Sequence, residues 1–368
     1  EEKLPELIKK FNVDYVFLSY SDLSHQEVMM KASFVLSCGA NFALLGTKDT
    51  MIKSKKPLIS VTAVRTGSGK SQTTRKIAQI LKSKGRKVVA IRHPMPYGDI
   101  LKERCQRFGN YNDLKKHKVT IEEREEYEPW IELGIPIYAG VDYEMILRKA
   151  EKEADVILWD GGNNDFSFYE SNLNIVVVDP HRAGHELTYY PGFVNFLMAD
   201  VIVINKIDSA KPSWIKIVEE NIKKYNNKAV VIKAKSPIKV DHGELIKSKK
   251  VLVVEDGPTL THGGMMYGAG TIAAKRYKAK EIIDAEKYAI GSLKETYKKY
   301  RHLKKILPAM GYSKQQIKEL QETINRAKCD IVIDGSPVNL SRLIKIKKPL
   351  VNVHYYLEEI GKITLKEV

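Results

Sequence analysis

Short apolar runs alternate with amphipathic stretches along most of the chain. Each run has the length and the Val and Ile content of a buried strand, and most are followed by residues with helical periodicity. The apolar runs are residues 14–19, 58–64, 87–91, 155–160, 174–178, 200–204, 229–234, 250–254, 330–334 and 350–355. Because parallel strands need long connections, usually helices, this alternation predicts an α/β fold with a doubly wound, mostly parallel sheet.

The run at residues 58–64 leads into the sequence GSGKS at 67–71, and a helical pattern follows as far as residue 84. In such a strand–turn–helix unit the backbone N–H groups cradle phosphate oxygens, and the helix N-terminus adds partial positive charge. Lys70 would reach the β- and γ-phosphates, and the Ser71 hydroxyl would hold Mg²⁺. The predicted nucleotide-binding residues of this loop are Thr66, Gly67, Ser68, Gly69, Lys70, Ser71 and Gln72.

The loop departs from the standard G-x-x-x-x-G-K-[ST] pattern at its first position, where Val64 stands in place of Gly. Arg65 follows, as in the variant in which a basic residue opens the loop. A chance Gly–Ser turn is the alternative, but strand, turn and helix all fall where the motif requires them. We therefore predict that residues 53–368 form a P-loop NTPase-like catalytic domain. Residues 1–52 would be part of an N-terminal α/β domain, incomplete here.

Charged residues gather where several strands end, and ligands bind at that edge in folds of this kind. The run at 155–160 stops at Asp160, which beside a P-loop would hold Mg²⁺. Arg92 and His93 follow the run at 87–91, and substrate contact and a plain turn are equally open for them. For Arg182 and His185 we favour anion binding over a solvent-facing turn.

The sequence NKID at 205–208 follows another strand. In an N-K-x-D motif the Asp accepts hydrogen bonds from a guanine base and the Lys stem stacks on the ring. Asn205, Lys206 and Asp208 are therefore predicted to bind the nucleotide base, which favours GTP.

Two polar stretches could carry further function. Residues 255–265 crowd acidic, Thr, His and Gly residues at a strand end, a composition that favours a functional loop over a long turn. We predict Glu255 as a metal ligand, and substrate contacts at Thr261, His262 and Gly263. Residues 120–129 begin with a capping box and continue with five Glu between 122 and 128, which could offer carboxylates but are more typical of a solvated helix face.

Composition narrows the classes of function. The chain has 368 residues, 43% of them hydrophobic, so it can bury a sizeable core. Three scattered cysteines suit a reducing cytosol, and we expect a cytoplasmic protein without a membrane span. The net charge of +16 fits a polyanionic substrate, nucleic acid or a Lys-rich thermophile surface. Since no nucleic-acid-binding motif is present, we expect no nucleic-acid partner.

Seven segments occur in an order that resembles the cyclic 2,3-diphosphoglycerate synthetases of methanogenic archaea. They are VTAVRTGSGKSQTTRKIAQIL, AIRHPMPYGDI, TIEEREEYEP, DVILWDGGNNDFSF, VVVDPHRAGHE, NKID and VEDGPTLTHGGM, within residues 53–353. The resemblance implies an ATP-dependent ligase that needs Mg²⁺ and K⁺. It would close a phosphoanhydride within 2,3-bisphosphoglycerate and release ADP and phosphate. Catalysis would rest on positioning and charge neutralisation by Lys70, Arg65 and Asp160.

Two other classes stay open from the sequence. One is a switch or metallochaperone GTPase of the deviant P-loop class, which the motif at 205–208 favours. The other is a nucleic-acid-binding module, which rests on charge alone. Because the deviant class often works as a dimer across its nucleotide, we expect a homodimer by analogy.

Overall fold

The computed structural model describes residues 2–93, 95, 99–161, 165–261, 264–311 and 313–368. A nine-stranded sheet organises the larger part, and only its two edge strands run antiparallel to their neighbours. Its strands in spatial order are β19 (Glu358–Ile360), β12 (Val230–Lys235), β11 (Val201–Ile204), β9 (Leu173–Val178), β4 (Leu58–Ala63), β8 (Val156–Asp160), β5 (Val88–Arg92), β7 (Ile137–Ala139) and β6 (Gln106–Phe108). The predicted α/β class with a mostly parallel sheet is confirmed.

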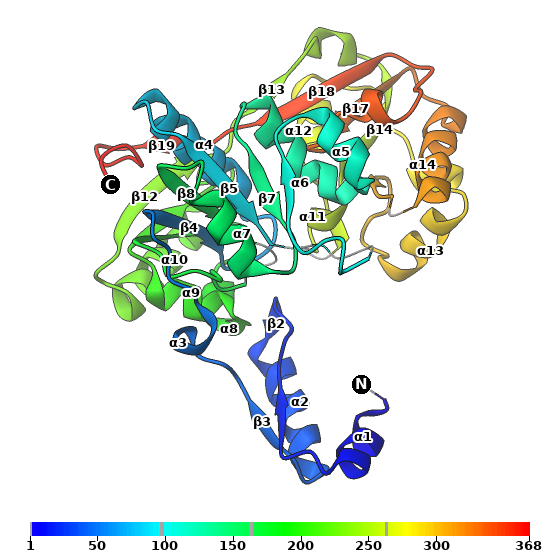
Figure 1. Cartoon of the computed structure of the whole chain (residues 1–368). Coiled ribbons are helices and arrows are strands. Elements are labelled where there is room, and N and C mark those ends of the chain that lie inside the picture. The colour runs from blue at the N-terminus through cyan, green and yellow to red at the C-terminus, as the bar shows by residue number, and fades with distance from the viewer. Residues whose placement is uncertain (1, 94, 96–98, 162–164, 262–263, 312) are drawn as a thin grey trace.

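Helices cover both faces of this sheet (Figure 1), which explains why its central strands are mainly apolar. On one face Ile77 and Trp130 pack against the strands, and on the other Phe196 and Val218 do so. The helices around this sheet are α4 (Lys70–Ser83), α5 (Tyr111–His117), α6 (Ile121–Glu132), α7 (Tyr143–Ala150), α8 (His185–Thr188), α9 (Gly192–Met198) and α10 (Pro212–Tyr225), with the 3-10 turn η1 (Pro180–Arg182).

A second sheet takes the C-terminal strands, whereas the sequence pattern suggested a single sheet. Alternating strands and helices do not reveal which strands pair, because pairing is decided by contacts distant in sequence. The second sheet contains β13 (Ile238–Val240), β18 (Leu350–Tyr355), β17 (Ile331–Gly335), β14 (Lys250–Asp256) and β15 (Glu281–Ile282), and β16 (Leu307–Ala309) also pairs with β14. Its helical elements are α11 (Gly257–Thr261), α12 (Ala269–Arg276), α13 (Ser292–Lys299), α14 (Lys314–Arg326), α15 (Leu340–Leu343), η2 (Gly243–Ile246) and η3 (Ala285–Tyr288).

Helix α6 lies between the two sheets (Figure 1). Its predicted capping box is present, since the Thr120 hydroxyl accepts from the Glu123 N–H at 3.2 Å and the Glu123 carboxylate accepts from the Thr120 N–H at 2.6 Å. Ile121 and Glu122 bond the backbone of Gly311, beyond β16 of the second sheet. The helix therefore has no fully solvated acidic face.

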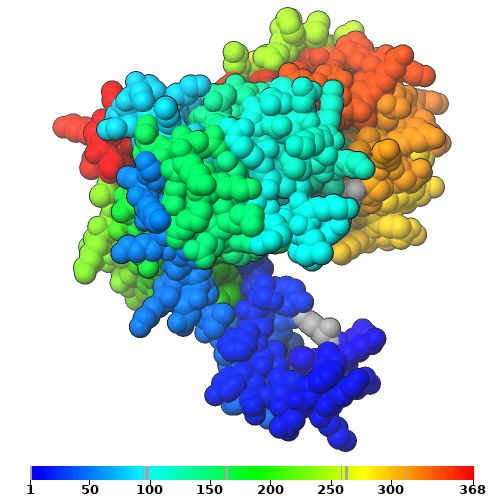
Figure 2. Space-filling view, in the orientation of Figure 1, coloured from blue at the N-terminus to red at the C-terminus, as the bar shows by residue number. Residues whose placement is uncertain are grey.

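The N-terminal residues form a small unit that projects from the rest of the molecule (Figure 2). It consists of α1 (Leu4–Phe11), β1 (Tyr15–Phe17), α2 (His25–Ser37) and β3 (Asn41–Ala43), with α3 (Thr47–Thr50) leading on to β4. Strand β2 (Leu23–Ser24) pairs with β10 (Tyr189–Tyr190), so this unit reaches the P-loop end of the large sheet.

Among the described residues, no helix combines the length and the apolar character needed to cross a membrane.

Candidate active site

The glycine-rich loop connects β4 to α4, as the sequence predicts. Gly67 and Gly69 have φ of +80° and +109°, a region that favours glycine. A Cβ atom on Gly69 would lie only 2.0 Å from the Asn205 side-chain nitrogen, so glycine is required there. The loop and the start of α4 thus have the form of a phosphate cradle.

Lys70 meets two of the three predicted metal ligands, Ser71 and Asp160. The Lys70 ammonium lies 2.7 Å from an Asp160 carboxylate oxygen and 3.3 Å from the Ser71 hydroxyl. Burial and the nearby charge of Arg92 lower the pKa of Lys70. Burial alone would raise the pKa of Asp160, but Lys70 and Arg92 outweigh it and the pKa is lowered, so this carboxylate is ionised. Ser71 and Asp160 are suitable oxygen donors for Mg²⁺ beside a bound triphosphate.

Arg92 connects three elements and is 6% exposed. Its guanidinium donates to the backbone oxygen of Gly161 at 2.6 Å and pairs with Glu126 of α6 at 2.6 Å. It also lies 3.5 Å from Asp160. Substrate contact and a plain turn were equally open for Arg92, and these bonds favour a structural role that holds α6 at the strand ends. Its neighbour His93 pairs with Asp165 at 2.5 Å.

Two arginine side chains stabilise the phosphate loop, Arg182 by bonding it and Arg65 by connecting it to neighbouring rings. The Arg182 guanidinium donates to the Thr66 carbonyl at 2.7 Å and to the Ser68 hydroxyl at 3.2 Å. Arg65 lies 2.8 Å from a His185 ring nitrogen, and its guanidinium stacks on the Tyr189 ring. Arg182, predicted to bind an anion, is therefore engaged with the loop itself.

The His185 ring contacts Arg65 and lies within the electrostatic influence of Arg182. Burial, followed by the charges of Arg65 and Arg182, lowers the pKa of His185 to about 4. At neutral pH its ring is uncharged, so its predicted contribution to anion binding cannot come from a positive charge.

Two residues of the motif at 205–208 bond backbone carbonyl groups of the phosphate loop. The Asn205 amide donates to the Ser68 carbonyl at 2.9 Å, and the Lys206 ammonium donates to the Gly67 carbonyl at 2.6 Å. Asp208 accepts from the Ser236 N–H at 3.1 Å. The structure thus brings Asn205 and Lys206 to the predicted nucleotide site.

Asp22, from the N-terminal unit, lies at the site although the sequence motifs did not single it out. It pairs with Arg65 at 2.7 Å and accepts from the Thr66 hydroxyl at 3.1 Å. Burial raises its pKa although Arg65 opposes the shift. The N-terminal unit therefore contributes a carboxylate to the outer side of the P-loop.

Glu255, predicted as a metal ligand, is used elsewhere. Its carboxylate accepts from the N–H groups of Gly268, Gly270 and Thr271 at 2.8–3.1 Å, and from the Thr271 hydroxyl at 2.9 Å. Both oxygens thus hold the start of α12, and the structure does not bring Glu255 together with Ser71 and Asp160. Thr261 is buried, with its hydroxyl donating to the Gly257 carbonyl at 2.9 Å. The predicted contacts His262 and Gly263 lie outside the described residues.

Asp256, next in sequence, reaches toward the P-loop through Thr259. The Thr259 hydroxyl donates to Asp256 at 2.6 Å, and its methyl group would lie 3.2 Å from a Cβ atom on Gly67. Thr259 of α11, which follows β14 directly, therefore lies beside the phosphate loop of the first sheet.

Carboxyl groups from three separate elements collect at this junction, which the sequence motifs did not predict. Glu122 and Glu125 come from α6, Asp256 from β14 and Asp334 from β17. Burial raises the pKa of Asp256 to about 6 and that of Asp334 to about 7. The five-Glu run was read as a solvated helix face, which is wrong for Glu122 and Glu125, at 2% and 5% exposed.

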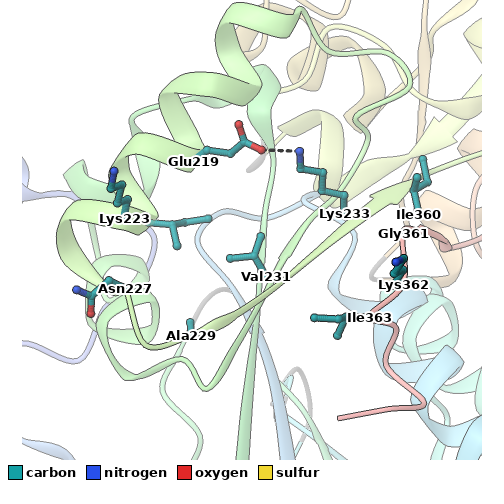
Figure 3. Close-up of a pocket in the computed structure, with 11 residues that line it drawn as sticks. Glu219, Lys223, Asn227, Ala229, Val231, Lys233, Ile360, Gly361, Lys362 and Ile363 are labelled. Atoms are coloured by element: carbon teal, nitrogen blue, oxygen red, sulfur yellow. Dashed lines mark ion pairs between the residues drawn. The ribbon is translucent and has the colours of Figure 1, made fainter.

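An open depression lies away from these residues, between α10, β12 and the C-terminal segment (Figure 3). Its volume is about 600 Å³, and its lining mixes aliphatic with charged side chains, among them the ion pair Glu219–Lys233 at 2.6 Å. None of its lining residues belongs to the motifs described above, so we place the chemistry at the P-loop junction.

Comparison with known proteins finds a close relative. The arginine synthetase ArcE of Thermococcus kodakarensis is 64% identical over 368 residues, covering 100% of this chain and 82% of the relative. No family model matches the chain.

Among solved structures, LpxK from Aquifex aeolicus, crystallised with ATP, aligns with a TM-score of 0.52 at 12% identity, over 97% of this chain and 95% of LpxK. That likeness shows a shared fold alone. The hydrogenase maturation factor HypB of Archaeoglobus fulgidus aligns with a TM-score of 0.33 at 20% identity, over 49% of this chain and 81% of HypB. A TM-score this low does not show a shared fold.

Proposed function

The chain belongs to the family of the arginine synthetase ArcE, and on that premise we propose that it is an ATP-dependent ligase that forms arginine. The relative's name agrees with the ligase that the motifs imply, and it specifies a nitrogen-rich product.

The observation that supports this product is the contact between the phosphate loop and an acidic strand end. Thr259 links Gly67 of the loop to Asp256, beside the buried Glu125 and Asp334. A guanidinium group would complement these carboxylates. A substrate with two phosphates would instead meet like charge.

The chemistry requires that nitrogen replace oxygen on one carbon. The γ-phosphoryl group of ATP would be transferred to the oxygen of a ureido amino acid such as citrulline, forming a P–O bond and releasing ADP. Ammonia would then form the C–N bond while the C–O bond breaks and phosphate leaves. The sum is citrulline, ammonia and ATP giving arginine, ADP and phosphate.

The residues of the first sheet would handle the nucleotide. The P-loop backbone and Lys70 would bind the phosphates, and Ser71 and Asp160 would hold Mg²⁺, which offsets phosphate charge. Asn205 and Lys206 brace the loop, with Asp208 beyond them, so this motif leaves ATP and GTP to be compared directly. We also propose that the enzyme requires K⁺ and acts as a homodimer.

A second candidate reaction is the closure of cyclic 2,3-diphosphoglycerate, which the order of the seven sequence segments favours. Its difficulty is that Arg65, Arg92 and Arg182 are each committed to a carboxylate, a ring or backbone carbonyls. Few buried cations are then left for a second anion.

The deciding experiment incubates the protein with Mg²⁺, K⁺ and either ATP or GTP. One arm contains citrulline and ammonium and is analysed for arginine, with ammonium omitted as the control. The other arm contains 2,3-bisphosphoglycerate and is followed by phosphorus NMR. Arginine that requires both citrulline and ammonium supports the first proposal, whereas a cyclic pyrophosphate supports the second. Slow hydrolysis indifferent to every addition would contradict both and leave the switch GTPase.

A further inference from the structure

Three carboxylates from separate elements meet at the carboxyl edge of the second sheet. Strands β14 and β17 are parallel neighbours, with Val254 opposite Asp334 and Glu255 opposite Gly335. Asp256 and Asp334 therefore reach the same edge. Helix α6 is attached beside that edge through Glu122, whose carboxylate accepts from the Gly311 N–H at 2.9 Å. Glu125 follows one turn later on α6.

Glu125 is buried without a compensating partner. Its side chain is 5% exposed, and its Oε1 atom has no hydrogen-bond partner among the described residues. Within the same residues, Glu125, Asp256 and Asp334 form no ion pair within 4.0 Å. Burying a carboxylate without a cation is costly, so this arrangement suits the arrival of a positive ligand.

The three carboxyl groups also interact electrostatically. Burial raises the pKa of Glu125 well above its usual value, and the charges of Asp256 and Asp334 are among the causes that add to the rise. Thr259 and Ser336 hold the two Asp side chains in place through hydroxyl bonds of 2.6 Å. The cluster is therefore an oriented set of acceptors that repel each other when all are ionised.

The spacing of the carboxylates distinguishes between cations. In the part of the chain that the structure describes, no three His, Cys, Asp or Glu residues lie close enough to hold one metal ion. A guanidinium group is a larger planar cation with five N–H donors directed outward, so it can reach acceptors that one metal ion cannot.

We propose that Glu125, Asp256 and Asp334 form the binding site for a guanidinium group. This inference rests on the proposed arginine-forming function and names the residues that would recognise its product. Through Thr259 and Gly67 the site lies beside the phosphate loop, where a ureido oxygen could receive a phosphoryl group. Since a ureido group is neutral and a guanidinium is positive, the carboxylates would stabilise charge that develops during the reaction.

The test is isothermal titration calorimetry on the full chain, with arginine and methylguanidinium as probes. Wild type is compared with Glu125→Gln, which preserves shape and removes the charge. The matched control is Glu132→Gln on the same helix, where the side chain is 54% exposed and outside the cluster. We expect Glu125→Gln to weaken both probes by at least about 30-fold, while the control binds as wild type does. Thermal melting of each variant verifies folding.

The outcomes separate this inference from the proposed function. If wild type makes arginine and Glu125→Gln binds both probes unchanged, the guanidinium site is wrong and the function stands. If wild type makes no arginine but binds methylguanidinium in a Glu125-dependent manner, the site stands and the function is wrong. If wild type binds neither probe, or if Mn²⁺ alone binds in a Glu125-dependent manner, the guanidinium site is overturned.

Discussion

The protein has two mostly parallel sheets whose carboxyl edges lie at the same junction, and these edges differ in charge. The first edge carries cations, and the second carries carboxyl groups. At the edge of the first sheet, Arg65, Lys70 and Arg92 each lie within 2.7 Å of a carboxylate oxygen. At the edge of the second, Asp256 and Asp334 have hydroxyl and backbone donors only, among the described residues. The first edge keeps its charges paired. The second keeps carboxyl groups without a cation, and burial raises their pKa values toward the neutral form.

This difference suggests a division of labour within the proposed ligase. A paired cation such as Lys70 can leave Asp160 for a phosphate at little cost, because one anion replaces another. An unpaired buried carboxylate gains stability only when a cation arrives. The first edge is therefore suited to the nucleotide and the second to a nitrogen-rich substrate or product.

The largest effect on activity should come from removing Lys70, which pairs with Asp160 at the edge of the first sheet. Lys70→Ala removes the ammonium that would contact the phosphates, so we expect kcat/KM for nucleotide-dependent turnover to fall by about 10²–10³-fold or more. The measurement is initial-rate kinetics for nucleotide turnover. Lys76→Ala, on the same helix with a side chain 38% exposed, is the control and should retain activity. Equal loss in both variants would contradict a specific role for Lys70.

Removing the connection between the two edges should cost stability. Arg92→Met leaves Glu126 and Asp160 without their shared buried partner, so we expect the free energy of unfolding to fall by about 3–5 kcal/mol. Urea denaturation measures this. The control is Arg107→Met, whose pair with Glu153 at 2.8 Å is 44% exposed on the Arg side and should contribute less than about 1 kcal/mol. A loss for Arg92→Met no larger than for the control would show that the connection is not structural.

The smallest effect concerns the unpaired edge and is seen through pH. Asp256 and Asp334 have pKa values raised to about 6 and about 7, so the folded chain holds protons that the unfolded chain has released. Their contribution therefore lowers stability as pH rises from about 4 through 7, and the cost is complete at about pH 8. Around them lie Glu125, Glu126, Glu255, Tyr355 and Arg92.

We expect Asp256→Asn to be more stable than wild type by roughly 1–2 kcal/mol at pH 8 and about equal to it near pH 4. Urea denaturation of the unliganded protein at several pH values measures the difference. A variant that is destabilised equally at both pH values would show that Asp256 is not strained by its charge.

Much of the first sheet could be predicted from the sequence because its signals are local. The glycines at 67 and 69 are needed for backbone geometry, and Lys70, Ser71 and Asp160 meet because a strand end beside a P-loop leaves little choice. The roles of Arg92 and Glu255 could not be read this way. A cation or carboxylate at a strand end looks the same whether it bonds a ligand or the protein's own backbone.

The sequence by itself determined the α/β class, the phosphate loop and the ends of the main strands, because periodicity and loop chemistry act within a few residues. Only the tertiary structure decided that there are two sheets, that the Glu-rich helix α6 is buried between them, and that Asp22 reaches the P-loop. Glu125 illustrates the reason. Its neighbours in sequence are charged, yet its burial depends on β14 and β17, more than a hundred residues away. Contacts at that separation leave no periodic trace in the chain.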